Sequence, residues 1–378
     1  MLPGVPLKEA KYKALTGQRP LDTCLFGDVL YVLYSLNSDP ALGPSSFLKK
    51  IDLNNFDGNF LQQPSVYARD VTTPGPRSLN IVDGALVICG ASPEILSLDG
   101  STVVYDEAEG RLNPVWNPGG WVHYWEGKVY RGYGYHVPEQ GVDVIDVHAQ
   151  AVIHHLDLDI RYSGPWQGEL MYGERINGDF AVYSLREQRY LFELPLQHYR
   201  LAYPQCRVVS RVSEGLAYVL VGDTLLQIDV SSGALLREIN YLQFSEVQVH
   251  MQAERLSMAD ACASSISVCG TSVVLTLFSI GGYALYLDLT TEQPRVWLWS
   301  AGCKVVAFNC QGDLIYGLSN AVPMAWDKYS GEVIWQTKNS TATNKIQVGD
   351  QWLVFSQGAG YIQCNHWAKP YISPQRPA

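Results

Sequence analysis

The sequence predicts an all-β fold, and three observations indicate it. Short apolar runs recur along the 378 residues, and turns rich in glycine, proline, aspartate and serine separate them. One kind of turn, which follows an apolar run ending in aspartate or serine, recurs near positions 54, 99, 148, 186, 231, 290 and 329. Further apolar runs between these turns bring each interval to four strands. A repeat of about 40–50 residues with four strands predicts a β-propeller.

The clearest of these turns lies in the segment Met324–Thr337, MAWDKYSGEVIWQT. Aspartate and serine side chains bond the backbone of turns, and glycine allows a positive φ angle, so this segment predicts strand, turn and strand. The pattern resembles the repeat of PQQ-type β-propellers, Ala-x-Asp-x-x-Ser/Thr-Gly-x-x-x-Trp, and the matching residues are Ala325, Asp327, Ser330, Gly331 and Trp335. Two partial copies are Leu226–Ile239, with Asp229, Ser232, Gly233 and then Arg237 at the tryptophan position, and Leu285–Trp299, with Asp288, Thr291 and then Glu292 at the glycine position. The resemblance implies the fold and not a catalytic site.

Seven units follow one another along the chain, each a series of alternating apolar runs. In the first unit we expect strands at Leu21–Phe26, Val29–Tyr34, Phe47–Leu53 and Asn59–Gln63, and in the second at Arg77–Val82, Ala85–Gly90, Glu94–Leu98 and Thr102–Asp106. The other five units are expected at Gly120–Leu158, Ser163–Leu196, Arg207–Tyr241, Ser265–Ser300 and Lys304–Thr337.

Three more strands follow the seventh unit, at Asn344–Val348, Trp352–Ser356 and Tyr361–Asn365, and they have no fourth strand. The N-terminal piece Glu9–Leu15 has no partner of its own, so pairing the two would cover both open edges. We therefore expect eight four-stranded blades, with an N-terminal strand closing the last. Seven blades are the alternative. In that arrangement the C-terminal strands would complete the first blade, and the fourth unit would not form a blade of its own. We expect one propeller domain over residues 1–378, with a short helical insertion near 252–263, where QAERLSMADACA has helix-forming composition.

Composition limits the classes of partner. The chain has 27 basic and 37 acidic residues and a formal charge of −10, which disfavours nucleic acid and anionic membranes and favours a basic partner. No run reaches the length of a membrane span, and the N-terminal residues contain no apolar core of signal-peptide length. We expect a cytoplasmic protein, although a processed periplasmic form would show the same features. The eight cysteines are scattered without a CxxC pair, which is typical of reduced, packed cysteines and predicts no zinc site.

With strands named A to D within each unit, the long irregular connections are mostly B–C or D–A links, which share one side of a blade. Long connections in compact domains are frequently functional. Aromatic residues and an arginine gather in and beside two of these connections, and such residues dominate protein-binding hot spots. The candidate binding residues are Trp116, Arg131, Tyr133, Tyr135 and His136.

Catalytic motifs are missing from the sequence. It contains no G-x-S-x-G, H-E-x-x-H, P-loop or G-x-G-x-x-G pattern, and the adjacent cysteines and calcium-ligand carboxylates of quinoprotein dehydrogenases cannot be located. The neighbouring His154 and His155 would face opposite sides of a strand, so we expect no metal ligands there and no cofactor.

These observations favour a non-catalytic, protein-binding propeller scaffold, with a bacterial accessory or immunity-type protein as one subtype. Two alternatives stay open. One is a propeller enzyme, quinoprotein dehydrogenase- or lactonase-like, with its site at the central channel. The other is a carbohydrate-binding propeller that uses tryptophan and tyrosine as stacking platforms.

Overall fold

The structure is a computed structural model of the chain. It describes residues 4–6, 12–15, 19–35, 46–69, 78–82, 84–89, 94–100, 102–106, 121–132, 141–149, 151–162, 168–200, 208–255, 257, 263–277, 282–300, 309–319, 322–337, 343–357 and 361–376. The chain forms two compact units. Unit 1 contains Glu9–Asp159 and Gln347–Trp367, and unit 2 contains Leu2–Lys8, Ile160–Ile346 and Ala368–Ala378.

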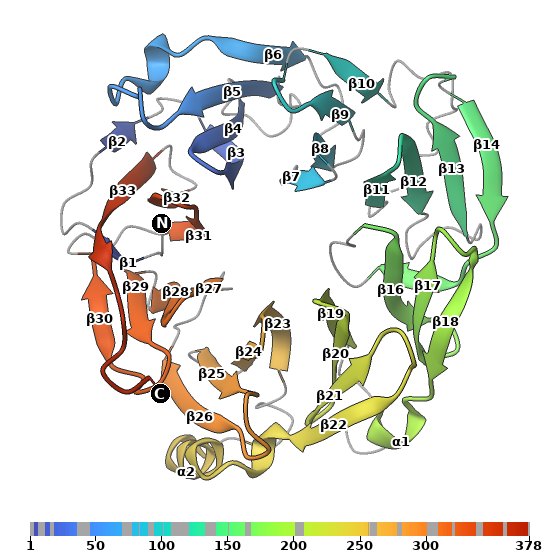
Figure 1. Cartoon of the computed structure of the whole chain (residues 1–378), viewed down its shortest axis with the longest axis vertical. Helices are drawn as coiled ribbons and strands as arrows, with labels where there is room; N and C mark the ends of the chain where they lie inside the picture. Colours follow the sequence, from blue (N-terminus) through green and yellow to red (C-terminus); the bar gives the residue numbers. More distant parts are fainter. Residues whose placement is uncertain are drawn as a thin grey trace. The chain divides into compact units, whose positions relative to one another are not determined.

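Unit 1 contains three complete four-stranded antiparallel sheets, or blades (Figure 1). Blade 1 is β3 (Arg19–Phe26), β4 (Val29–Ser35), β5 (Ser46–Asp52) and β6 (Ser65–Arg69); blade 2 is β7 (Ser78–Val82), β8 (Ala85–Cys89), β9 (Glu94–Ser97) and β10 (Val103–Asp106); blade 3 is β11 (Trp121–Trp125), β12 (Lys128–Gly132), β13 (Val142–Asp146) and β14 (Ala151–Leu156). The first strands of neighbouring blades contact each other, β3 with β7 and β7 with β11.

Unit 2 contains four more such sheets. Blade 4 is β15 (Ile160–Tyr162), β16 (Leu170–Arg175), β17 (Phe180–Ser184) and β18 (Arg189–Leu194); blade 5 is β19 (Val209–Ser213), β20 (Leu216–Val221), β21 (Thr224–Asp229) and β22 (Leu235–Asn240); blade 6 is β23 (Ala263–Cys269), β24 (Ser272–Leu277), β25 (Tyr283–Asp288) and β26 (Arg295–Ser300); blade 7 is β27 (Asn309–Gln311), β28 (Leu314–Ser319), β29 (Val322–Asp327) and β30 (Val333–Gln336). Here, too, first strands contact each other, β19 with β23 and β23 with β27.

The eighth blade joins both ends of the sequence. Strands β31 (Thr343–Val348), β32 (Trp352–Gln357) and β33 (Tyr361–Pro370) form one sheet, and β33 also pairs with β1 (Gly4–Pro6) and β2 (Tyr12–Leu15). The expected closure by an N-terminal strand is therefore confirmed, since β2 lies within Glu9–Leu15. The fold is an all-β propeller of eight blades, and the seven-blade alternative does not hold.

Two expected elements are displaced. The fourth strand of blade 1 is β6, not Asn59–Gln63, because Asn59 caps a 3₁₀ turn, η2 (Phe60–Gln62), by accepting the N–H of Gln62, and Phe60 is buried. Blade 4 begins earlier than expected, at β15.

The helical insertion expected near 252–263 is described only in part. The helix α2 spans Ser245–Glu254 and overlaps that segment at its start, and residues 256 and 258–262 lie outside the described residues. It ends because Arg255 adopts the left-handed conformation and donates its N–H to the carbonyl of Gln252. Val247 and Met251 bury one side of α2 against the core of blades 5 and 6. A second, four-residue helix, α1 (Gln197–Arg200), follows blade 4.

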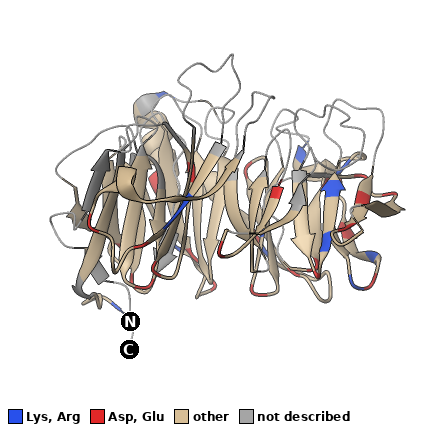
Figure 2. Cartoon of the chain, turned by 90° about the horizontal axis from the view of Figure 1, so that it is seen from above, with Lys and Arg blue, Asp and Glu red and all other residues tan. Residues whose placement is uncertain are grey.

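The tight turns form as the sequence predicts. The carboxylate of Asp327 accepts the backbone N–H groups of Tyr329 and Ser330 at 2.8 and 2.9 Å, and the N–H of Gly331 donates to the Asp327 carbonyl at 2.8 Å. Asp229 repeats this arrangement in blade 5 with Ser232 and Gly233. Acidic residues therefore recur at the turns (red in Figure 2).

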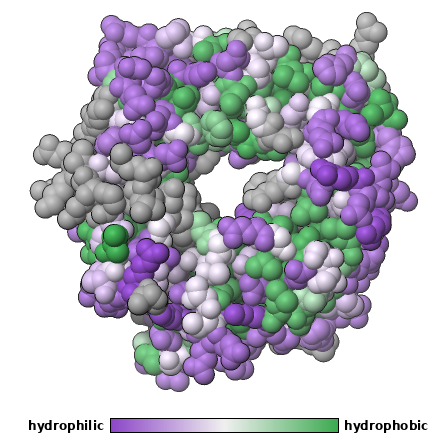
Figure 3. All heavy atoms as spheres, in the orientation of Figure 1, coloured by the Kyte–Doolittle hydropathy of each residue, from purple (hydrophilic) through white to green (hydrophobic). Residues whose placement is uncertain are grey.

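The apolar core lies between blades and not within one sheet. In unit 2, one cluster joins Tyr218 and Leu225 of blade 5 to Val273 and Leu287 of blade 6. Each blade thus buries both faces of its inner strands, and the fourth strands stay partly exposed, as the pattern of β14 shows. Hydrophilic residues cover much of these outer strands (Figure 3).

Tyrosine recurs as the third residue of the second strand, at Tyr31, Tyr130, Tyr172, Tyr218 and Tyr316, and all five are buried. The Tyr31 hydroxyl donates to the Leu98 carbonyl of the next blade at 2.5 Å, and the Tyr218 hydroxyl donates to the Gly270 carbonyl at 3.1 Å. These bonds attach the second strand of one blade to the turns of the following blade.

Candidate functional site

One of the five candidate binding residues, Arg131, lies within the part of the chain that the structure describes. Trp116, Tyr133, Tyr135 and His136 fall outside it, so their role stays a prediction. Arg131 is on β12, next to the residue with which that strand ends, and the B–C connection of blade 3 follows directly.

The side chain of Arg131 belongs to a row of three charged or titratable groups that crosses blade 3. Arg131 is the register partner of Asp143 on β13, and Asp143 is the partner of His155 on β14. The Nη2 of Arg131 donates to Oδ2 of Asp143 at 2.8 Å. The Nδ1 of His155 lies 2.9 Å from Oδ1 of the same carboxylate, and because a carboxylate only accepts, Nδ1–H is the donor.

The centre of the row is its most buried member. The Asp143 side chain is 8% exposed, the Arg131 side chain 15% and the His155 side chain 48%. A buried carboxylate costs several kcal/mol of desolvation unless it is paired, and here both oxygens have a donor. The ion pair therefore fixes the arginine, while the imidazole forms the exposed end of the row.

The row also fixes both ends of the connection that carries Tyr133, Tyr135 and His136. Arg131 precedes this connection, and Gly141 and Asp143 follow it. Gly141 has a φ of 114°, and a Cβ atom there would lie 2.5 Å from Nε2 of His155, so the imidazole packs directly on the glycine backbone. Only glycine fits this position.

Below the row, blade 3 packs on blade 2. Val129 and Ile145 are each two residues from a member of the row on the same strand, so they share its face of the sheet. Both belong to a buried cluster with Ala85, Val87 and Ile95 of blade 2. The charged row thus lies at the edge of the apolar interface between blades 2 and 3, and the packing of that interface holds the row in place.

Two members of the row, Asp143 and His155, were not predicted as binding residues from the sequence. The interpretation of His154 and His155 as neighbours that face opposite sides agrees with their pairing, since His154 pairs with Val144. The partnership of His155 with Asp143 depends on the register of β13 and β14, which shifts between Val144 and Ile145. The sequence did contain one signal for the pairing of Arg131 with Asp143. Both residues lie one position inside their strands on either side of the B–C connection of blade 3.

The connections differ in length between the two ends of the strands. The A–B links include residues 27–28, 126–127, 214–215, 270–271 and 312–313, whereas long B–C or D–A links span 36–45, 107–120, 133–141, 195–208 and 241–262. The pattern has exceptions on both sides. The B–C links of residues 176–179, 222–223 and 320–321 are short, and two links at the other side are long. Residues 53–64 join β5 to β6, and residues 163–169 join β15 to β16.

Among the residues with described positions, no group of three or more histidine, cysteine, aspartate or glutamate side chains is arranged to hold a metal ion. In the same part of the chain, no helix has the length and apolar character needed to cross a membrane.

No family model matches the chain, and no curated protein matches it. Solved structures with the same fold include the computationally designed Ika8 protein, which is 12% identical with a TM-score of 0.59 over 97% of this chain and 100% of the designed one. BamB from Moraxella catarrhalis is 9% identical with a TM-score of 0.60 over 95% and 99% of the two chains. Sqt1 from Saccharomyces cerevisiae is 10% identical with a TM-score of 0.61 over 97% and 100%.

At these identities the likeness extends to the fold alone. The chain is therefore an eight-bladed β-propeller that resembles the PQQ-like repeat propellers in architecture.

Proposed function

We propose that this chain is a non-catalytic β-propeller that binds another protein through its B–C and D–A connections, with the B–C connection of blade 3 as an anchor. The observation that carries the proposal is the fixed row of Arg131, Asp143 and His155. It holds an arginine and both ends of an aromatic-rich connection in place before any partner arrives. Preorganised side chains lose less conformational entropy on binding.

The residue types support a protein partner. Tyrosine, tryptophan and arginine are enriched among the residues that contribute most to protein–protein affinity, and Trp116, Tyr133 and Tyr135 are of these types. The formal charge of −10 favours a basic partner, because opposite charges speed association. A bacterial accessory or immunity-type protein, which neutralises a basic partner, is one role of this kind.

Affinity purification from the organism that encodes the chain tests the proposal with three proteins and a matched control. The first is the unchanged chain. The second carries Tyr133→Ala and Tyr135→Ala. The third carries Arg131→Gln with Asp143→Asn, which removes both charges together and leaves neither buried alone.

His148→Ala is the matched control, because His148 is exposed in the turn at the opposite end of β13. We expect one protein, retained in stoichiometric amount by the unchanged chain and by His148→Ala, and reduced at least tenfold by the other two variants. Equal retention by all four proteins would exclude this connection as the binding surface. Retention of no protein at all would count against the function.

A further inference from the structure

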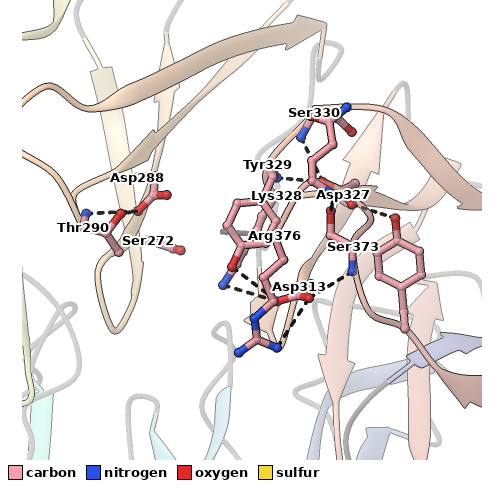
Figure 4. A network of polar contacts seen from close by, with 12 residues as sticks. Ser272, Asp288, Thr290, Asp313, Asp327, Lys328, Tyr329, Ser330, Ser373 and Arg376 are labelled. Atoms are coloured by element: carbon pink, nitrogen blue, oxygen red, sulfur yellow. Dashed lines mark hydrogen bonds and ion pairs between the residues drawn. The ribbon is translucent and has the colours of Figure 1, made fainter. Parts of the chain in front are cut away.

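Residues 371–376, which follow β33, lie outside every sheet and cover two turns of blade 7 (Figure 4). The hydroxyl of Tyr371 donates to Oδ2 of Asp327 at 2.6 Å. The backbone N–H of Ser373 donates to Oδ2 of Asp313 at 3.0 Å, and Nη1 of Arg376 lies 3.8 Å from the same oxygen. This segment is held by specific polar contacts and not by strand pairing.

The receiving surface consists of two nearly buried carboxylates. Asp313 is 4% exposed in the A–B turn, and Asp327 is 1% exposed at the end of β29. A bond from the N–H of Lys328 to the carbonyl of Asp313, at 3.0 Å, ties the two turns together. Figure 4 shows Ser373 between the two aspartates, and the hydroxyl oxygen of Ser373 accepts the N–H of Gln375 at 3.1 Å. The carboxylates thus present a fixed pair of acceptors to one short peptide.

The segment alternates between contacts and solvent. Ser373 is 4% exposed, whereas Ile372 between it and Tyr371 is 65% exposed. After Ser373, the N–H of Arg376 donates to the Ser373 carbonyl at 3.3 Å, and Pro374 occupies the second position of this turn. The turn directs Arg376 toward Asp313, so the peptide supplies part of its bound shape by itself.

We propose that the turn side of blade 7 is a recognition site for a short peptide of the form Tyr-x-Ser-Pro-x-Arg, which residues 371–376 occupy in this chain. A second copy of this peptide, supplied by another polypeptide, competes for the two aspartates. The two aspartates recognise the tyrosine hydroxyl, the serine N–H and the arginine guanidinium of the peptide. The residue after the tyrosine can be of any type, because Ile372 is exposed at this position. This peptide site uses a different blade and different residues from the binding surface proposed above, and it does not depend on that surface.

Blade 1 supplies a matched control. Its A–B turn contains Asp28 and its third strand ends in Asp52, and the N–H of Leu53 bonds the carbonyl of Asp28 at 2.9 Å as Lys328 does with Asp313. The carboxylate of Asp28, however, accepts the side-chain amides of Asn54 and Gln351 at 3.1 and 3.0 Å. The two blades thus share the same backbone arrangement at this turn. The aspartate of the turn is bound by neighbouring side-chain amides in blade 1 and by the peptide in blade 7.

The test uses a fluorescent synthetic peptide, acetyl-YISPQR-amide, and the full-length chain with Tyr371→Phe and Ser373→Pro. These changes remove the hydroxyl and the N–H that hold the segment while leaving blade 7 intact. We call this double substitution the released variant, because its own segment no longer occupies the two aspartates. Measured by fluorescence anisotropy, the peptide should bind the released variant at least tenfold more tightly than it binds the unchanged chain. Adding Asp313→Asn should remove that gain, and adding Asp28→Asn should leave it.

A second measurement avoids dependence on the folding of the released variant. Excess unlabelled peptide is added to the unchanged chain, and hydrogen exchange of the Ser373 amide is followed by mass spectrometry. Competition predicts faster exchange in the segment 371–376 and no change in blade 1. Unchanged exchange at saturating peptide, or peptide binding that is insensitive to Asp313→Asn, would overturn the proposal.

Discussion

The indole Nε1–H of Trp297 donates a hydrogen bond to the carbonyl oxygen of Lys328 at 3.2 Å. Trp297 is on the fourth strand of blade 6, whereas Lys328 is in the turn of blade 7. The same indole lies against Gly331 of that turn. The turn motif therefore serves two purposes, because it reverses the chain within its own blade and receives a side chain from the blade before it.

This relationship predicts an unusually high cost for Gly331→Ala. Gly331 has a φ of 73°, and a Cβ atom would lie 3.2 Å from the Trp297 ring. An L-residue in the left-handed region costs about 1–2 kcal/mol, and overpacking adds about 1–3 kcal/mol. Gly215→Ala is the matched control in the same unit, since its φ is 76° with nothing within 4 Å of the added atom. Urea unfolding followed by circular dichroism should show the larger loss for Gly331→Ala, and equal losses would contradict the docking role of Trp297.

A second prediction concerns the tyrosines that bridge blades. Tyr218 is fully buried, and its hydroxyl donates to the Gly270 carbonyl and accepts from Nε2 of Gln227 at 3.3 Å. Tyr218→Phe leaves both partners unsatisfied in a buried place, so we expect a loss of about 1–3 kcal/mol of unfolding free energy. Tyr199→Phe removes a comparable bond, to Glu238 at the surface, and should cost less than about 1 kcal/mol. Chemical denaturation of both variants checks this order, and the reverse order would refute it.

The sequence predicted the number of blades and the tight turns because both depend on local chemistry. Aspartate, serine and glycine determine a turn such as Asp327–Gly331 by themselves, so its repetition reveals the period. The fourth strand of blade 1 was misplaced because the link after Asp52 is long and contains η2, so that β6 begins only at Ser65. The bridging tyrosines also carried a signal, since a turn glycine precedes Tyr31, Tyr130 and Tyr218 by three or four residues.

The candidate site was harder to predict because it depends on pairing between strands. Arg131 was identified from its neighbours in sequence, but its partner Asp143 and the outer His155 depend on register. A register shift at Val144 and Ile145 cannot be read from alternation, because the same apolar pattern suits the strand with or without it. The start of α2, at Ser245, was not predicted for a similar reason: buried contacts of Val247 and Met251 favour a helix there, and composition does not show them.

A third prediction concerns acid stability. Hydrogen bonds from Ser231 and Ser232 lower the pKa of Asp229 to about 2. A folded-state pKa below the ordinary value of 3.8 means that these bonds stabilise the protein above about pH 4 and that their contribution is lost as the pH falls toward 2. Asp229→Asn should therefore lower the melting temperature at pH 7, with a difference from the unchanged chain that disappears near pH 2. Melting curves at pH 7, 4 and 2 measure this, and a difference independent of pH would rule out the carboxylate as its source.

The fourth prediction concerns Lys49 on β5, which is only 4% exposed. Its Nζ donates to the Phe60 carbonyl at 2.7 Å and lies 4.5 Å from the centroid of the Phe60 ring and 5.4 Å from that of Tyr34. Burial lowers the pKa of Lys49 below its ordinary value of 10.5. Desolvation of the charged amine therefore destabilises the fold, and the cation–π contacts and the hydrogen bond offset part of this cost. The same hydrogen bond holds η2 against the sheet.

Lys49→Met keeps the apolar stem and removes both the cost and the bond, so we expect a change within about 1 kcal/mol at pH 7. Lys49→Ala also removes the stem, and the resulting cavity should cost about 2–4 kcal/mol. Because unfolding takes up a proton at Lys49 only between its lowered pKa and 10.5, the unchanged chain should gain stability relative to Lys49→Met as the pH rises toward 10. Urea unfolding at pH 7 and pH 9.5 measures the relative gain. A stability difference that is constant or that falls with pH would show that the amine is not charged and desolvated in the folded state.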